Sequence, residues 1–370
     1  MSDGIKLGFV LLSNTQNAIP STRIVVLNML PYLRAAGFDP HIVFEPATST
    51  KTPNVAGVAE KIKAGNFQVV VLQKVFGDSV LELARELRQA GIKTVFAICD
   101  FVNPVMCEAT DATIVVTDYL KSLYPKELQP KVAVVHDGVE RPERQKTAWN
   151  NHDGSRARPL NAVLVTSAAL DHLPLLESLP AWLKVTIVGS YSAPGFRLQR
   201  WKENYWQMVN KNGWANRWRY LRFLANPRIA CEAWGPDSVY DALERADFGI
   251  IPIKPDPMKD PTGEWKLKSE NRLTLKMAMG LPVVATPIPS YEPVIEEGVN
   301  GFLARSQGDW VRCLSALRDP DARQAIGRNA RNTALSGYSK DFQAQRFIEV
   351  LRSVVSGDSL SAHGLNGSLT

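Results

Sequence analysis

The chain has 370 residues, which is too long for one typical domain and comfortable for two. Hydrophobic residues make up 45% and charged residues 22%, as in ordinary globular proteins, and no apolar run reaches the ~18–20 residues of a membrane-spanning helix. The net charge of +6 suits phosphate-bearing ligands or an anionic membrane surface, whereas the basic residues are too dispersed to predict binding to nucleic acid.

The N-terminus and the cysteines both bear on where the protein works. Residues 1–14 lack a basic region and a small-residue cleavage site, so we predict a first strand there and not a signal peptide. The cysteines form no CxxC pair and have no histidine cluster beside them, which predicts a reducing, cytoplasmic environment and no metal site. They are Cys99, Cys107, Cys231 and Cys313.

The first part of the chain alternates short apolar runs with amphipathic stretches. Apolar residues recur at helical spacing over residues 22–36 and again over residues 79–90, so we predict helices there. Strands that alternate with helices form βαβ units, and the sequence therefore predicts a parallel, doubly wound α/β sheet. The predicted strands are residues 5–12, 41–44, 69–72, 94–98, 112–116 and 132–135.

The alternation stops near residue 140 and then resumes. Residues 141–159 are polar and have no periodicity, which predicts a linker between domains. A second Rossmann-like half follows, so we expect the ligand at the carboxyl ends of both sheets, in the cleft between the domains. Its predicted strands are residues 162–166, 185–188, 248–252, 281–285 and 301–304, and its predicted helices are residues 237–246, 273–280, 308–317 and 322–335.

Residues 268–285 (KSENRLTLKMAMGLPVVA) predict a helix that runs directly into a buried strand. Ser269 is a candidate N-cap, and Gly280 ends the helix. Lys268 and Arg272 lie near the helix N-terminus, where free backbone N–H groups and two cations form an anion site, most naturally for phosphate. The alternative is an ordinary capped helix with a solvated first turn.

Five short segments occur in an order that is typical of one protein family. They resemble, in turn, its VSxxL-type segment, VIPNGVD, the FLGxVxxEELxxYYxxADVxVxPS stretch, MAxGxPVVA and GVNGLL. The segments are residues 115–123 (VVTDYLKSL), 134–140 (VVHDGVE), 234–252 (WGPDSVYDALERADFGIIP), 277–285 (MAMGLPVVA) and 298–303 (GVNGFL). In this order the chain resembles the GT-B glycosyltransferases, specifically the large retaining class that uses sugar nucleotides.

The resemblance covers roughly residues 5–355 and implies a domain layout. An N-terminal Rossmann-like, acceptor-side domain and a C-terminal Rossmann-like, nucleotide-sugar domain would be joined by a linker. A final helix would return to the N-terminal domain, and a Gly/Ser-rich tail would be disordered. The expected boundaries are residues 1–142, 143–159 for the linker, 160–338, 339–355 for the helix and 356–370 for the tail.

The chain departs from the family at the helix that follows residue 268. Most members carry two glutamates in an E-x7-E motif, and counting back from Gly280 places Leu275 and Leu267 at those positions. The sequence instead resembles a subset in which KSxNR precedes the helix. The resemblance implies a binding site for the donor diphosphate at Lys268, Ser269, Asn271 and Arg272.

Two further expectations concern the donor. Glu270 and Glu292 are the candidates for the contact with the nucleotide ribose that the second family glutamate usually makes. No DxD stands at a strand end, and lysine and arginine can neutralise the leaving phosphates, so no metal and no other cofactor is expected. The expected donor is a UDP- or GDP-sugar.

The N-terminal domain contributes candidate site residues at the beginning of one helix and at the ends of two strands. Ser21, Thr22 and Arg23 begin a helix where the family places acceptor and donor-phosphate contacts, and they form either an oxyanion-binding turn or a plain helix cap. Asp100 ends a buried strand, where it can accept the acceptor proton or else cap a turn. His136 ends another strand and is a candidate contact in the cleft, or a structural histidine.

Residues 196–228 interleave aromatic and basic side chains between two predicted strands. One interpretation is an amphipathic insertion that contacts a membrane surface or a lipid-linked acceptor. The other is a helical insertion that packs on its own domain with its arginines solvated. The aromatic residues include Trp201, Tyr205, Trp206, Trp214, Trp218, Tyr220 and Phe223.

Together these features predict a glycosyltransferase that moves a sugar from a nucleotide donor to a hydroxyl of a surface glycan, a lipid-linked sugar or a small molecule. We expect it in the cytoplasm, with the inner membrane surface as a further possible site of action. A non-catalytic GT-B protein that binds a nucleotide or glycan is the alternative, since the glutamate pair is absent. A GT-B sugar-nucleotide epimerase is a third class, which the missing His and Glu constellation disfavours.

Overall fold

The computed structural model describes residues 4–166, 179–192, 197–253 and 263–360. The chain folds into two compact units. Unit 1 comprises Met1–Glu140, Lys266–Asn271 and Ser336–Thr370, and unit 2 comprises Arg141–Trp265 and Arg272–Leu335. Each unit is therefore assembled from segments that are distant in the sequence.

Unit 1 is built on a six-stranded sheet in the order β2-β1-β3-β4-β5-β6. Every strand pair in it is parallel. Strands β3 and β5 are buried along their whole length, as a sheet covered on both faces requires. The strands are β1 (Ile5–Leu11), β2 (Phe38–Phe44), β3 (Val69–Gln73), β4 (Lys93–Ile98), β5 (Ala112–Val115) and β6 (Val132–Val134).

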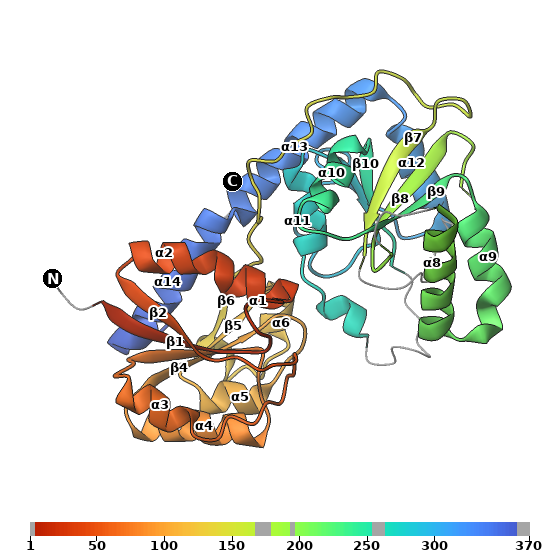
Figure 1. Cartoon of the computed structure of the whole chain (residues 1–370). Coiled ribbons are helices and arrows are strands. Elements are labelled where there is room, and N and C mark those ends of the chain that lie inside the picture. The colour runs from red at the N-terminus through yellow and green to blue at the C-terminus, as the bar shows by residue number, and fades with distance from the viewer. Residues whose placement is uncertain (1–3, 167–178, 193–196, 254–262, 361–370) are drawn as a thin grey trace. The chain divides into compact units, whose positions relative to one another are not determined.

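Helices cover both faces of this sheet (Figure 1). One core forms beneath α3, α4, α5 and α6, and the other beneath α1, η1, α2 and the C-terminal helix α14. The helix that returns from the far end of the chain is thus confirmed. The helices are α1 (Pro20–Val25), η1 (Leu27–Met29), α2 (Leu30–Ala35), α3 (Val58–Ala64), α4 (Asp78–Gln89), α5 (Pro104–Ala109), α6 (Asp118–Ser122), η2 (Gln129–Lys131) and α14 (Lys340–Ser356).

The helix predicted over residues 22–36 is interrupted in the structure. Pro31 has no N–H to donate to the carbonyl four residues earlier, so a continuous α-helix cannot form across it. The chain instead forms α1, a short 3₁₀ turn and α2, with the break at Val26. Pro20 is the first residue of α1 and Ile19 is its N-cap.

Unit 2 contains a second six-stranded parallel sheet, in the order β12-β11-β10-β7-β8-β9. Its two faces bury separate cores, one with α12 and α13 and the other with α10. The two tandem Rossmann-like halves confirm the predicted fold class. The strands are β7 (Leu160–Val165), β8 (Leu183–Gly189), β9 (Ile229–Ala233), β10 (Phe248–Ile251), β11 (Val283–Ala285) and β12 (Phe302–Leu303).

The remaining helices of the described residues complete the second half of the chain. Asn271 of α11 and residues 336–338 of α13 belong to unit 1 by their contacts. The helices are α8 (Arg197–Asn212), η3 (Trp214–Asn216), α9 (Arg217–Ala225), α10 (Ser238–Arg245), η4 (Glu264–Leu267), α11 (Asn271–Ala278), α12 (Gln307–Ala316) and α13 (Pro320–Tyr338). Of the predicted tail, residues 361–370 lie outside the described residues.

Gly280 ends α11 as the sequence predicts. Its φ of 81° is in the left-handed region, where a residue without Cβ has no steric penalty. Its N–H donates to the carbonyl of Met277, and the N–H of Leu281 donates to the carbonyl of Lys276. This pair of bonds is a Schellman motif, which satisfies the last carbonyls of the helix before β11 begins.

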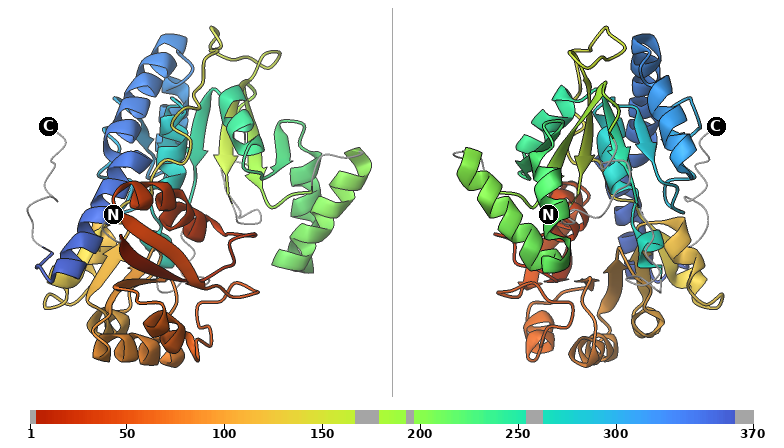
Figure 2. Two further views of the ribbon diagram at one scale, coloured as in Figure 1. Left: turned by 60° about the vertical axis from the view of Figure 1, so that its left-hand side comes forward. Right: turned by 90° about the vertical axis from the view of Figure 1, so that its right-hand side faces the viewer.

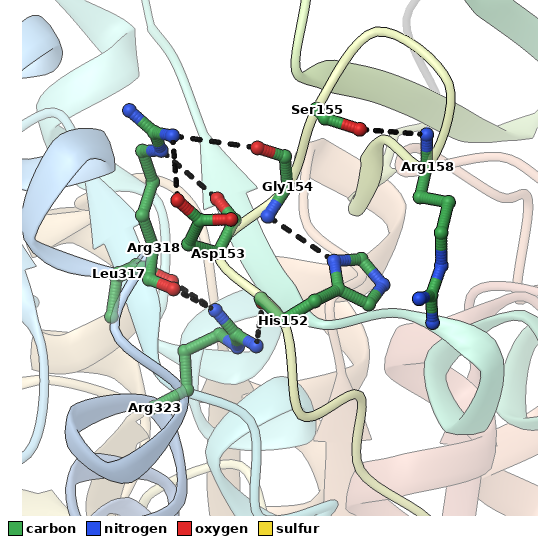
Figure 3. Close-up of polar contacts among 8 residues, drawn as sticks. All are labelled: His152, Asp153, Gly154, Ser155, Arg158, Leu317, Arg318 and Arg323. Carbon is green, nitrogen blue, oxygen red and sulfur yellow. Dashed lines mark hydrogen bonds and ion pairs between the residues drawn. The ribbon is translucent and has the colours of Figure 1, made fainter.

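The stretch that the sequence predicts to be a linker is held firmly within unit 2 (Figure 3). Arg323 of α13 is fully buried and donates to four carbonyl oxygens, those of Asn150 and His152 in this stretch and those of Leu317 and Arg318. Arg318 adds bonds to Asp153 at the surface. The backbone after the boundary at Glu140 is therefore ordered by arginines of α12–α13.

Residues 197–225 form a helical pair at the edge of unit 2, α8 and α9, which lie side by side in Figures 1 and 2. Met208, Val209 and Tyr220 form a small buried core between them. Trp206, Trp214 and Trp218 are 42%, 55% and 64% exposed. No helix within the described part of the chain is long and apolar enough to cross a membrane.

Candidate functional site

Polar side chains gather at the carboxyl edge of the sheet in unit 1. Residues that directly follow β3, β4 and β6 lie there, because parallel strands all end at the same edge. Gln73, Lys74, Cys99 and His136 line one cavity at this edge, together with Gln343 of α14. The edge thus collects titratable groups from several strands, which is the usual position of a ligand site in such sheets.

Lys74 and Asp100 form an ion pair at the ends of β3 and β4. The Nζ atom of Lys74 lies 2.7 Å from Oδ2 of Asp100, and both side chains are largely buried. The other carboxylate oxygen, Oδ1, is buried and accepts no hydrogen bond within the described structure. A buried acceptor without a donor costs free energy, so this oxygen is positioned to receive a ligand hydroxyl.

The backbone of Lys74 is strained. Its φ is 57°, in the left-handed region, which costs a residue with a Cβ on the order of 1 kcal/mol. Its N–H is held by the carbonyl of Ala97 at 2.8 Å. Strain of this kind concentrates at functional sites, where the surrounding structure forces a side chain into a required position.

Protonation at this pair is set by burial and by the two neighbours. Burial alone would lower the pKa of Lys74, but the negative charge and hydrogen bond of the adjacent Asp100 act in the opposite direction, and the pKa of Lys74 is raised. Burial raises the pKa of Cys99 to about 12, so its thiol is neutral at physiological pH. The pair is therefore an ammonium facing a carboxylate, beside a neutral thiol.

His136 follows β6 and bonds with Glu270, which comes from the segment Lys266–Asn271. Its Nδ1 atom lies 2.9 Å from Oε1 of Glu270 and 3.0 Å from the carbonyl oxygen of Val116. Both partners are acceptors when Glu270 is ionised, so Nδ1 carries the hydrogen and Nε2 is left for another partner. Burial alone would lower the pKa of His136, but Glu270 outweighs it and raises that pKa.

Asp137 binds the neighbouring residue of the same segment. Ser269 Oγ donates to Oδ2 of Asp137 at 2.7 Å. Burial raises the pKa of Asp137 to about 6, and the nearby Glu270 carboxylate adds to the rise. Ser269 and Glu270 therefore both bond with the end of β6, at sequence separations of more than 130 residues.

These contacts bear on two predicted donor contacts. Glu270 is buried, and its carboxylate bonds with His136 of unit 1 inside the protein. The hydroxyl of Ser269 donates to Asp137. The ribose contact of Glu270 and the diphosphate contact of Ser269 stay predictions. The helix α11 begins at Asn271, so Glu270 and not Ser269 directly precedes it.

The predicted oxyanion turn makes its contacts within unit 1. Thr22 is buried, accepts from Ser13 and donates to Gln73 Oε1 at 3.1 Å. Arg23 forms a two-pronged ion pair with Glu140 at 2.7 and 2.9 Å. The Ser21 hydroxyl is buried without a hydrogen-bond partner in the described structure. The phosphate role of this turn stays a prediction, with only Ser21 left unpaired.

The other predicted donor residues are spread over the second half of the chain. Lys268 is partly exposed in the segment that carries Ser269 and Glu270, and Asn271 and Arg272 are the first two residues of α11. Glu292 is an exposed residue that pairs with Arg305 at 3.3 Å. The diphosphate role of these residues and the ribose role of Glu292 are not tested by their geometry.

Sequence analysis missed Lys74, Asp137 and Lys276. Lys74 and Asp137 are polar residues after predicted strands, and the rule that selected Asp100 and His136 selects them too. Lys276 is a fully buried lysine of α11 that lies four residues after Arg272, which itself lies four residues after Lys268. That i, i+4, i+8 spacing of cations is visible in the sequence.

Across residues 4–166, 179–192, 197–253 and 263–360, no group of three or more His, Cys, Asp or Glu side chains is arranged to hold a metal ion.

Comparisons with known proteins identify the architecture. Residues 169–349 match a family described as glycosyl transferase-like. No match is found among curated proteins. Among solved structures, HepE of Anabaena in complex with UDP and glucose is similar, at 16% identity and a TM-score of 0.63 over 94% of this chain and 100% of that one. The chain has the GT-B fold.

Two other GT-B neighbours extend over equally long regions. A glycosyltransferase of Rickettsia africae has 14% identity and a TM-score of 0.65, over 96% of this chain and 100% of that one. Sucrose-phosphate synthase of Thermosynechococcus elongatus has 12% identity and a TM-score of 0.62, over 95% of this chain and 100% of that one. The predicted GT-B architecture is confirmed by structures that share only 12–16% sequence identity with this chain.

Proposed function

We propose that this GT-B protein is a glycosyltransferase that transfers a sugar from a nucleotide-sugar donor to a hydroxyl. The observation that carries the proposal is the buried, unpaired Oδ1 atom of Asp100 at the carboxyl edge of unit 1. A carboxylate that is held on one side by Lys74 and lacks a donor on the other can accept a hydrogen bond from an acceptor hydroxyl.

In this proposal each residue of the edge has one role. Asp100 accepts or orients the acceptor proton, and Lys74 fixes the carboxylate by its 2.7 Å ion pair. His136 presents Nε2 as a further contact, because its Nδ1 is bonded to Glu270. The three side chains follow the ends of β3, β4 and β6 at one edge of a single parallel sheet, which favours precise positioning.

The donor is proposed to be a UDP- or GDP-sugar. Lys268, Asn271 and Arg272 are the proposed diphosphate contacts, since two cations and the first backbone N–H groups of a helix stabilise a leaving nucleoside diphosphate. HepE is similar in fold and was solved with UDP-glucose, which supports UDP as the first nucleotide to test. Transfer with retention and without a metal ion is part of the proposal.

The acceptor is proposed to be a hydroxyl of a glycan, a lipid-linked sugar or a small molecule, used in the cytoplasm. A lipid-linked acceptor is favoured by the exposed tryptophans of α8–α9, which would lie against a membrane surface.

The test is nucleotide release from a panel of UDP- and GDP-sugars, with and without EDTA, in the presence of pooled acceptors. We expect release of one nucleotide that depends on acceptor and is insensitive to EDTA. Loss of release in EDTA would contradict the metal-free mechanism alone.

A non-catalytic binding protein is the second candidate, favoured by Leu267 and Leu275 at the places of the family's two glutamates. Nucleotide binding without release from any donor and acceptor pool, by a folded protein, would establish that candidate instead. A thermal-shift panel of nucleotides reveals the binding directly, because a ligand that binds only the folded state raises the melting temperature.

A further inference from the structure

Lys276 of α11 is a fully buried lysine in unit 2. Its Nζ atom donates to the carbonyl of Arg272 at 2.9 Å, which leaves two of its three hydrogens without an acceptor in the described structure. Its aliphatic stem packs on β10, where an added Cβ at Gly249 would lie 2.5 Å from Cδ of Lys276. The side chain is therefore fixed between the helix and the sheet.

The elements that pack around Lys276 supply no described carboxylate to balance its charge. β10 and β11 carry only apolar side chains and glycine. Arg272 is the charged group that acts on it, from its own helix. Arg331 of α13 and the backbone of Lys146 reach the opposite end of α11, at the carbonyls of Ala278 and Met279.

The topology fixes the direction in which this lysine points. Since β10 and β11 are parallel neighbours, α11 must run antiparallel to them, and its N-terminus lies at the carboxyl edge of the sheet. The bond to the carbonyl of Arg272 directs the ammonium group of Lys276 back along the helix toward its first turn. Two cations without a described counter-ion thus lie at the ligand-binding edge of unit 2.

Protonation of this side chain is finely balanced. Burial, with a smaller contribution from Arg272, lowers the pKa of Lys276 to about 7. The lysine is then mainly neutral at pH 8, which relieves the repulsion between the two cations while no anion is present.

We propose that Lys276 takes up a proton when a phosphate-bearing ligand binds at the first turn of α11, so that anion binding in unit 2 is coupled to the charge of a buried lysine. An anion beside Arg272 favours the charged form of Lys276, and the proton comes from solvent. The proposal rests on the proposed function, in which that ligand is the diphosphate of a nucleotide-sugar.

The coupling has a consequence for the transfer reaction. A nucleoside diphosphate that leaves its sugar carries one more negative charge than it carries in the nucleotide-sugar. The charged form of Lys276 is favoured more by the product diphosphate than by the donor, so its interaction strengthens as the glycosidic bond breaks. In this proposal Lys276 does not touch the reacting atoms. It acts through the electrostatic effect of its charge on the bound diphosphate, so it is a positioning residue.

Isothermal titration calorimetry with UDP and with GDP, each in two buffers of different ionisation enthalpy, tests the proposal. At pH 8 we expect uptake of close to one proton per nucleotide bound by the wild-type chain. At pH 6 the uptake should approach zero, because Lys276 is already charged in the free protein.

The decisive comparison uses Lys276→Met, with Lys184→Met as the matched control. Lys184 is an exposed lysine of β8 in the same unit. The uptake at pH 8 should be lost in Lys276→Met and kept in Lys184→Met, which separates Lys276 from the other titratable groups of the chain. Equal uptake in Lys276→Met and wild type overturns this inference and leaves the proposed function intact. Absence of any nucleotide binding overturns both.

Discussion

At the scale of single residues, burying the charge of Lys276 lowers the free energy of unfolding, and this effect can be measured without any ligand. Its pKa of about 7 in the folded chain lies below the ordinary value of 10.5. Below about pH 7 the lysine is charged in both states, and the folded state bears the full cost of burying the charge. As the pH rises toward 10.5, the unfolded chain binds more protons than the folded chain, so the cost declines.

Lys276→Met should therefore stabilise the protein, and more so at low pH. We expect a gain on the order of 3–5 kcal/mol at pH 6 and a clearly smaller gain at pH 9.5. Urea denaturation at the two pH values measures it, with Lys184→Met as the control that shows no such pH dependence. A gain that is equal at both pH values would mean that burial does not lower this pKa.

The Lys74–Asp100 pair makes a second prediction at this scale. Asp100→Asn keeps the shape and an acceptor for Lys74 but removes the base, so acceptor-dependent nucleotide release should fall by ~10²–10⁴-fold. The measurement is the release rate with the donor found by the panel, and a circular dichroism melt confirms that the variant is folded. Asp39→Asn is the control, because Asp39 is an exposed residue of the same unit that pairs with His41. Equal loss in both variants would remove Asp100 from the catalytic role.

At the scale of elements, the pair α8–α9 has two faces of different character. Its buried face holds Met208, Val209 and Tyr220, as the interpretation of an insertion packed on its own domain expects. Its outer face carries three exposed tryptophans, and Trp206 and Trp214 stack edge to face at 5.6 Å. Residues 196–228 contain eight Lys and Arg residues against one Glu. Aromatic rings among cations suit the interface of an anionic bilayer.

We predict that the purified protein floats with anionic liposomes and not with zwitterionic ones. The double variant Trp214→Ser, Trp218→Ser should lose most of this binding while remaining folded, because both side chains are more than half exposed. Sucrose-gradient flotation at low salt is the measurement. The control is Val311→Ser, which removes an exposed apolar side chain outside α8 and α9. Trp182 does not serve as a control because it packs against the core of unit 2. No lipid-dependent flotation by the wild type would contradict the membrane contact.

Sequence reasoning identified elements well where one local signal dominates. Apolar runs located the strands of the first sheet and all strands of the second except β9, and Gly280 located the end of α11. The short helices α3 and α5 and the half-buried strand β9 lack a long periodic signal, and they were not predicted. The break before α2 follows from Pro31. The prediction of one continuous helix relied on the apolar periodicity of residues 22–36 and gave too little weight to this proline.

Sequence reasoning located the candidate site only in part. Asp100 and His136 were predicted because strand ends are identifiable from the apolar runs that precede them. The bonds from Ser269 to Asp137 and from Glu270 to His136 were not, because they join segments more than 130 residues apart and depend on tertiary structure. Such pairings have no local pattern that a single sequence displays.

At the scale of the whole molecule, unit 1 is discontinuous. Helix α14 supplies Phe347, Leu351 and Val354 to the core on one face of a sheet whose strands all come from the first 140 residues. A chain truncated at residue 339 should leave that face uncovered, bind the dye ANS and aggregate. A chain truncated at residue 360 is the control and should remain monodisperse.

Phe347→Ala in the full chain should lower the free energy of unfolding by about 3–5 kcal/mol.

The discontinuity of unit 1 also sets an order of events during synthesis. The strands of its sheet leave the ribosome first, but the helix that seals one face is translated roughly 200 residues later, after about 10–40 s at about 5–20 residues per second. Unit 2 is complete in the nascent chain before that helix exists. The first sheet is therefore synthesised before unit 2 but completes its core after it. During that interval one apolar face of the sheet is uncovered, and we expect a ribosome-associated chaperone to bind it.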